Sequence, residues 1–190
     1  MVIRAGDRPP TVRRVDAPGR LAALLRDRGA ERIEHPGGTL AAHLERVQLL
    51  LARLGAGPDV QLAGRAHAVY GTDGFAVRLL ADDERPLLAE IIGPAAEELV
   101  HRYGGCDRDR TWPDLAATGL VHDRRTGQAE RLAGPQLRDF ADLSLVNELD
   151  VAGHAPGFVE QHGGYFRRLT EAWAPVLSPA VLAEARRVLG

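Results

Sequence analysis

Two histidines, His43 and His67, could bind a metal ion together, because their predicted positions allow the two imidazole rings to meet. They lie on consecutive predicted helices, and each borders or occupies the apolar face of its helix, so both imidazoles can point into the cleft between the helices. A buried imidazole without a partner costs about 1–3 kcal/mol, and neutral imidazole is the commonest metal ligand. Spacing alone leaves two interpretations: hydrogen-bonded core histidines, which are the commoner case, or a pair of metal ligands.

Other polar residues could complete a metal site around this pair. His35 lies in the loop just before the helix that carries His43, and three histidines with an open position form a workable mononuclear Zn or Fe(II) site. Asp107 and Asp150 are candidate carboxylates, either as a fourth ligand or as hydrogen-bond partners of a ligand.

Three residues are candidates for catalysis: Tyr70, Asp107 and Arg108. Tyr70 is predicted one helical turn after His67, where it could donate a proton or orient a substrate, or be an ordinary core tyrosine. Arg108 beside Asp107 could hold an anionic substrate such as phosphate or carboxylate, although surface ion pairs are the commoner role. His162 lies on an apolar stripe next to two aromatic residues, which indicates a core histidine.

Helices must position these residues. Thr39 is the predicted cap of the clearest helix, 39–54, in which leucines and a valine recur at steps of four and three, and Asp59 begins the next, which runs to Tyr70. Residues 106–118 are predicted to be a loop. Further helices are expected over 16–28, 84–92, 94–103, 135–152, 158–174 and 179–189.

One short β-hairpin is expected over residues 119–132, because two β-prone runs flank the turn Asp123-Arg-Arg-Thr-Gly127. The fold class is therefore mainly α, with a helical bundle and this hairpin in a single domain, 16–190. Residues 1–15 are predicted to be a flexible arm, since Pro9-Pro10 blocks helix formation.

Composition narrows the classes of function. The chain has 190 residues, a net charge of -2 and one cysteine, Cys106, and all 24 basic residues are arginine. We therefore expect a cytoplasmic protein that acts on a small molecule, without nucleic-acid or membrane partners, and homodimerisation is left open. No nucleotide-binding or other organic-cofactor motif is present. The histidine set makes a divalent metal, Fe, Mn or Zn, the expected cofactor.

The stretch Thr39-Leu-Ala-Ala-His43-Leu-Glu-Arg-Val47, followed by Leu62-Ala-Gly-Arg-Ala-His67-Ala68, resembles the opening of an HD domain, the helical metal-hydrolase superfamily. The likeness continues through residues 87–100, which are similar in arrangement to the bacterial alarmone (ppGpp) hydrolase domain. An uncharacterised bacterial family of HD-like proteins resembles the chain more closely, over roughly residues 20–150. This resemblance implies an HD-like bundle whose last metal ligand falls at Asn147.

The chain departs from the HD pattern where carboxylates are expected. Ala68 stands where the pattern has Asp, Gly71 and Thr72 replace an acidic pair, and the final Asp is Asn147. An amide balances the charge of a cation poorly, so we expect a histidine-rich metal site formed by His35, His43 and His67. The resemblance implies a hydrolase of a small anionic metabolite; an HD-like iron oxygenase and a non-catalytic binding or dimerisation module are the alternatives.

Overall fold

The computed structural model describes residues 16–190, so the predicted arm, 1–15, lies outside the described residues. The fold is mainly α, as predicted, with short antiparallel β pairs. The helices are α1 Ala17–Asp27, α2 Leu40–Arg53, α3 Pro58–Ala66, α4 Arg85–Ile92, α5 Pro94–Gly105, α6 Arg108–Thr111, α7 Leu115–Thr118, α8 Gly134–His154, α9 Phe158–Trp173 and α10 Pro179–Leu189. The strands are β1 Glu34–His35, β2 Gly38–Thr39, β3 Leu120–His122 and β4 Ala129–Arg131.

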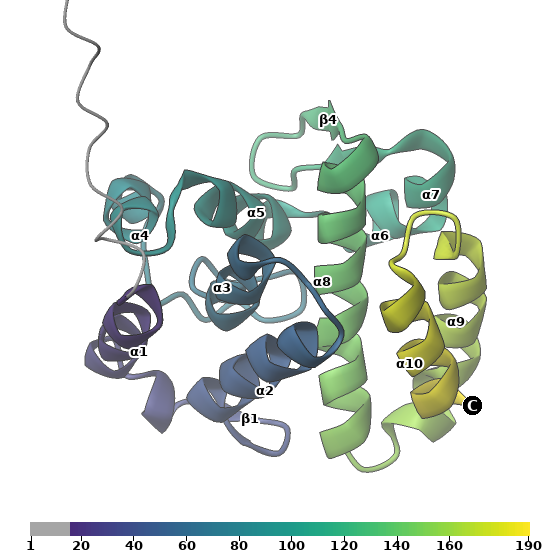
Figure 1. Cartoon of the computed structure of the whole chain (residues 1–190), viewed down its shortest axis with the longest axis horizontal. Coiled ribbons are helices and arrows are strands. Elements are labelled where there is room, and N and C mark those ends of the chain that lie inside the picture. The colour runs from purple at the N-terminus through teal and green to yellow at the C-terminus, as the bar shows by residue number, and fades with distance from the viewer. Residues whose placement is uncertain (1–15) are drawn as a thin grey trace, which may run out of the picture.

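Helix α8 is the central element of the fold. It runs between α9 and α10 on one side and α2, α3 and α5 on the other (Figure 1). Every residue from Phe140 to Asp150 is buried, including the polar residues Asn147 and Glu148. A helix covered on all sides has no single apolar stripe, and its buried polar side chains must find partners inside the protein.

Local sequence signals explain why α2 carries His43 into the interior. The Thr39 hydroxyl accepts a hydrogen bond from the Ala42 amide at 3.3 Å and caps the first turn. The predicted apolar face is buried, and His43 is buried with it. The long contact of α2 with α3 brings the second histidine close.

The second predicted helix ends earlier than expected. Helix α3 stops at Ala66 and His67 is its C-terminal cap, whereas the helix was predicted to continue to Tyr70. The chain leaves the helix because the Val69 carbonyl accepts hydrogen bonds from Leu79 and Leu80 at 2.8 and 2.9 Å. The placement of Tyr70 one helical turn after His67 was therefore wrong.

Two predicted loops contain regular structure. Residues 106–118 form the short helices α6 and α7, because Asp107 caps the first of them by accepting a hydrogen bond from the Arg110 amide at 3.1 Å. The loop before α2 closes as the two-residue pair β1–β2, with His35 opposite Gly38.

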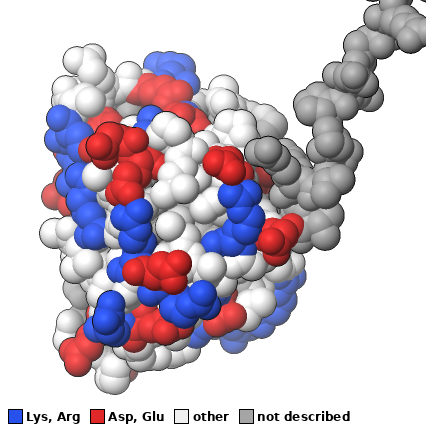
Figure 2. All heavy atoms as spheres, turned by 90° about the vertical axis from the view of Figure 1, so that its left-hand side faces the viewer, with Lys and Arg blue, Asp and Glu red and all other residues white. Residues whose placement is uncertain are grey.

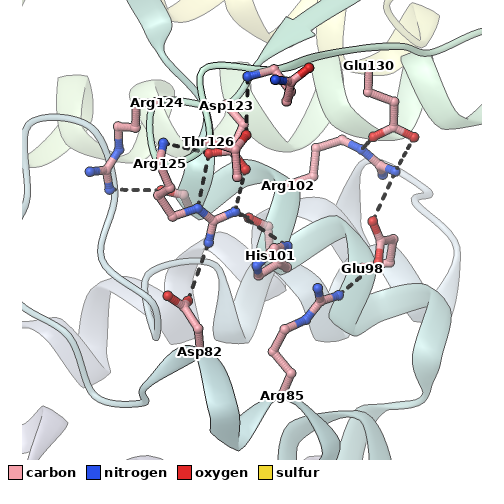
Figure 3. Close-up of polar contacts among 12 residues, drawn as sticks. Asp82, Arg85, Glu98, His101, Arg102, Asp123, Arg124, Arg125, Thr126 and Glu130 are labelled. Carbon is pink, nitrogen blue, oxygen red and sulfur yellow. Dashed lines mark hydrogen bonds and ion pairs between the residues drawn. The ribbon is translucent and has the colours of Figure 1, made fainter.

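The hairpin lies where the sequence predicts it, with Val121 opposite Glu130. The Arg125 guanidinium holds its turn in place, because it donates to both oxygens of Asp123 and to the His101 carbonyl (Figure 3). Arg102 donates to both oxygens of Glu130 on β4. A hydrogen bond from Arg125 thus joins the predicted Arg-Thr-Gly turn to α5, and an ion pair joins β4 to the same helix.

Opposite charges alternate on the face of the molecule that includes α1 and α4 (Figure 2). Arg20 pairs with Glu90 at 3.0 Å across these helices, and Arg28 pairs with Glu84. Among the described residues, no helix combines the length and apolarity needed to cross a membrane.

Gly104 is required where α5 approaches the segment after His67. A Cβ at this position would lie 2.9 Å from the Gly71 carbonyl oxygen and 3.3 Å from the Tyr70 Cβ. Because the first of these atoms is backbone, we expect Gly104→Ala to lower the free energy of unfolding by about 1–3 kcal/mol. Urea denaturation measures the change.

A matched helical control is Gly164→Ala on α9, whose Cβ would meet only the Arg168 guanidinium at 3.7 Å. Alanine is the better helix former, so this variant should gain up to about 1 kcal/mol. Equal effects at both glycines would contradict the close approach of α5.

Candidate metal centre

A cavity of about 270 Å³ lies where the end of α3 meets α2, α8 and the β1–β2 loop. Residues far apart in the sequence form its walls, because α8 brings its own polar side chains next to those of the first helices. The lining residues are Glu34, His35, Pro36, His43, His67, Ala68, Thr72, Asp73, Gly74, Phe75, Arg108, Asn147, Glu148 and Val151.

His43 and His67 meet in this cavity, which confirms that the two rings lie together. Their Nε2 atoms are 3.3 Å apart, and the side chains are 1% and 2% exposed. The Oδ1 atom of Asn147 is 3.0 Å from the His43 Nε2. Polar atoms from two other segments therefore both lie within hydrogen-bond distance of the His43 Nε2.

Hydrogen bonds define which atoms of these side chains carry protons. The His67 Nδ1 lies 2.8 Å from the Gly64 carbonyl, and the His43 Nδ1 lies 2.7 Å from the Asp150 carboxylate. Both partners can only accept, so each Nδ1 is the donor. Burial, reinforced by the nearby His43, lowers the pKa of His67 to about 3, so this ring is neutral and its Nε2 has a free lone pair.

The amide of Asn147 is oriented in the same way. Its Nδ2 donates to the Glu148 Oε1 at 2.9 Å, which turns Oδ1 toward His43. In this arrangement Oδ1 and the His67 Nε2 both present lone pairs to the His43 Nε2.

Asp150 orients His43 from behind and is not among the residues that line the cavity. Arg46 donates to both oxygens of Asp150, at 2.8 and 2.9 Å, and also to the carbonyls of Pro36 and Gly37. Burial alone would raise the pKa of Asp150, but the hydrogen bonds from His43 and Arg46 lower it to about 2. Its position matches the predicted role of hydrogen-bond partner to a ligand, not that of a fourth ligand.

His35 lies over His43 without pointing to the same atom. The two rings are stacked, with centroids 4.0 Å apart and planes 21° apart. Burial and the nearby His43 lower the pKa of His35 to about 4, so it is also neutral near pH 7.

Arg108, the predicted anion-binding residue, lines the cavity but is already paired. Its NH1 donates to the Glu148 Oε1 at 2.8 Å and its NH2 to the Tyr103 hydroxyl at 2.8 Å. The guanidinium also lies 4.8 Å from the Trp112 ring centroid. These contacts hold it against the wall, so any anion must share it with Glu148.

The three carboxylates that line the cavity were not predicted as site residues. Asp73 lies in the segment after His67, and its Oδ2 accepts a hydrogen bond from the Arg108 amide at 2.9 Å. Glu148 follows Asn147 directly on α8, and no sequence signal marks it, because this part of the helix is buried on all sides. With Glu34 they give the cavity three carboxylates against one arginine.

Tyr70 and Asp107 lie outside the cavity lining. The Tyr70 hydroxyl donates to Glu97 at 3.0 Å, and burial together with this carboxylate raises its pKa. Asp107 caps α6. The interpretation of His162 as a core residue was wrong, because it lies on the exposed side of α9.

The donor set determines what the site could hold. Within residues 16–190, no group of three His, Cys, Asp or Glu side chains is arranged to bind a metal ion. The converging set is two imidazoles and one amide oxygen. An amide oxygen and the Nε2 of a neutral imidazole are acceptors, which is the chemistry that a cation requires, but they carry no negative charge of their own.

Comparison with known proteins gives one match. Residues 24–108 match the model of a domain family of unknown function, DUF6817. This region includes His35, His43 and His67, and it ends before α8 and Asn147. No curated protein and no solved structure matches the chain.

Proposed function

We propose that this chain is a metal-dependent enzyme with an HD-like helical core, in which His43, His67 and Asn147 hold one divalent cation, Fe, Mn or Zn. Its substrate is a small anionic molecule, and hydrolysis is the reaction that the resemblance favours. The approach of the His67 Nε2 and the Asn147 Oδ1 to the His43 Nε2 in the cavity is the observation that carries the proposal.

Two facing lone pairs repel each other unless a positive charge lies between them. The separation of 3.3 Å between the two Nε2 atoms is also suitable, because nitrogen ligands at about 2.0–2.1 Å from a tetrahedral zinc ion are separated by about 3.3–3.4 Å. A proton shared by the two rings is the competing explanation for the same distance.

The charge of the cavity supports a cation. Glu34, Asp73 and Glu148 outnumber Arg108, so the lining has excess negative charge. A free anion would be repelled by these carboxylates, whereas a divalent cation would balance them and could then attract an anionic group. The expectation of an anionic substrate therefore depends on the metal.

When bound, a divalent ion supplies Lewis acidity and lowers the pKa of a coordinated water. The chain's own residues position the reactants. Asp150 holds His43 in the required tautomer, and Arg108 with Glu148 forms a polar wall that can orient a substrate. Asp73 places a further carboxylate at the wall, where it can accept a proton.

Two alternatives keep the same scaffold. An iron-dependent oxygenase suits a site that is rich in histidine and poor in carboxylate. A non-catalytic binding or dimerisation module is favoured by Ala68, which lines the cavity where the HD pattern has a carboxylate.

Elemental analysis of protein purified without added metal tests the proposal. We expect about one equivalent of Fe, Mn or Zn, because the acceptor atoms are preorganised for one ion. Protein that contains no metal and takes up none of the three in a calorimetric titration would contradict the proposal and favour the module. Stoichiometric iron would favour the oxygenase over the hydrolase.

A further inference from the structure

The orientation of one amide decides whether Asn147 can bind a cation. Its oxygen Oδ1 lies 3.0 Å from the His43 Nε2, and its nitrogen Nδ2 donates to the Glu148 Oε1 at 2.9 Å. A rotation of about 180° around the bond between Cβ and Cγ would exchange these two atoms. Only the oxygen has a lone pair to offer to a metal ion, so the rotated amide would be a hydrogen-bond donor and not a ligand.

His43 by itself favours the rotated amide in the state that binds a cation. Its Nδ1 donates to Asp150, so a neutral ring has an unprotonated Nε2 that accepts. The rotated Nδ2 would donate to that nitrogen, whereas the observed Oδ1 faces it with a second lone pair. The observed orientation therefore needs a stronger preference on the other side of the amide.

Glu148 supplies this preference. Its carboxylate has no hydrogen to donate, so it accepts from Nδ2 and would repel the Oδ1 of a rotated amide. The Arg108 guanidinium donates to the same oxygen, Oε1, at 2.8 Å, and is itself held by the Tyr103 hydroxyl at 2.8 Å. Glu148 is 7% exposed, so this acceptor has a fixed position and little competition from water.

We propose that Glu148 is a positioning residue of the cation site, whose carboxylate keeps the Asn147 Oδ1 turned toward His43. This inference rests on the proposed function, because it concerns how the ligand Asn147 becomes available to the ion. An aspartate in its place would need no such partner, since both of its oxygens accept. The requirement for Glu148 is therefore specific to an asparagine ligand, and substitutions at both positions can reveal it.

Two neutral substitutions of Glu148 separate the effect of the acceptor from the effect of the charge. Glu148→Gln keeps an oxygen that can accept from both Arg108 and Asn147, whereas Glu148→Leu is of similar size and has no acceptor. Both remove the same negative charge from the cavity. We expect Zn²⁺ to bind about tenfold more weakly to Glu148→Leu than to Glu148→Gln, which is the loss expected for a displaced amide ligand. Calorimetric titration measures both constants.

The same two substitutions in the Asn147→Asp background distinguish orientation of the ligand from damage to the fold. A ligand with two equivalent oxygens cannot be turned the wrong way, so the Gln and Leu variants should bind Zn²⁺ equally in that background. An effect of packing, or of the Arg108 charge that loses its partner, would appear in both backgrounds. Circular dichroism checks that each variant is folded.

Glu34 is the matched control, because it lines the same cavity from β1 and, within residues 16–190, accepts no hydrogen bond from Asn147. Glu34→Gln and Glu34→Leu should bind Zn²⁺ equally. Equal affinities of the two Glu148 variants would overturn the inference and leave the proposed function standing, and so would an undiminished difference in the Asn147→Asp background. A parent chain that binds no Zn²⁺ would contradict the proposed function itself.

Discussion

Replacing His43 or His67 by alanine is expected to weaken divalent-metal binding by at least about 100-fold. Each change removes one of three converging donor atoms, and even the outer hydrogen-bond partners of metal ligands are worth about 10–100-fold in affinity. Asn147→Ala should have a smaller effect, of about tenfold, because a neutral amide is a weak ligand. Calorimetric titration with Mn²⁺ and Zn²⁺ measures each constant.

A second substitution at Asn147 tests directly whether a cation binds at this point. Asn147→Asp restores the carboxylate of the HD pattern without changing the size of the side chain, and it adds a negative charge beside the His43 Nε2. Affinity should then rise, on the order of tenfold, because a charged oxygen ligand binds a cation more tightly.

The exposed His162 provides the control, as His162→Ala removes an imidazole without touching the cavity. If folded His43→Ala and His67→Ala proteins retain the metal content of the parent chain, these residues are core histidines that share a proton. A decrease in affinity for Asn147→Asp would argue against a cation at this point.

Asp150→Ala is expected to cause the largest loss of stability among the polar substitutions of the site. This carboxylate is 4% exposed and accepts from both His43 and Arg46. Removing one partner of a buried ion pair costs about 3–5 kcal/mol, and the lower end applies because the Arg46 side chain is 23% exposed. Urea denaturation at pH 7 measures the change.

The Asp150 carboxylate should make the free energy of unfolding depend on pH in the acidic range. Its pKa is lowered from 3.8 to about 2 in the folded protein. A group with a depressed folded pKa stabilises the protein fully above its unfolded pKa, and the contribution is lost as the pH falls through the folded value. Between pH 4 and pH 2 we therefore expect the parent chain to lose about 1–2 kcal/mol, after allowance for solvent screening, that Asp150→Asn does not lose.

Glu171→Ala is the matched control for both measurements, because Glu171 pairs with Arg186 on the surface and is 58% exposed. It should leave the free energy of unfolding nearly unchanged. A cost for Asp150→Ala no larger than for Glu171→Ala would show that the Arg46–Asp150–His43 contacts do not hold this part of the fold.

The family match covers the first half of the candidate site, and the second half comes from α8. His43 and His67 lie within residues 24–108, whereas Asn147 and Glu148 lie beyond them. The metal proposal thus needs both segments, and the HD-like relation remains a prediction that the Asn147 variants test.

The sequence alone determined the mainly α class, the helix that carries His43 and the hairpin at Val121 and Glu130. These features depend on local signals, namely the Thr39 cap, the apolar repeat and the turn residues, which act within one or two helical turns. The pairing of His43 with His67 was also predictable, because both border apolar faces that must meet.

Only the tertiary structure decided which polar atoms reach the cavity. After the turn that follows Ala66, the Tyr70 hydroxyl lies against Glu97. No local sequence signal predicts this turn, because the hydrogen bonds to the Val69 carbonyl come from Leu79 and Leu80, farther along the chain. Likewise α8 is buried all round, so its apolar pattern cannot show that Asn147 and Glu148 enter the cavity while Asp150 lies behind His43. Contacts between distant segments fix the rotation of a buried helix, and periodicity in its own sequence does not.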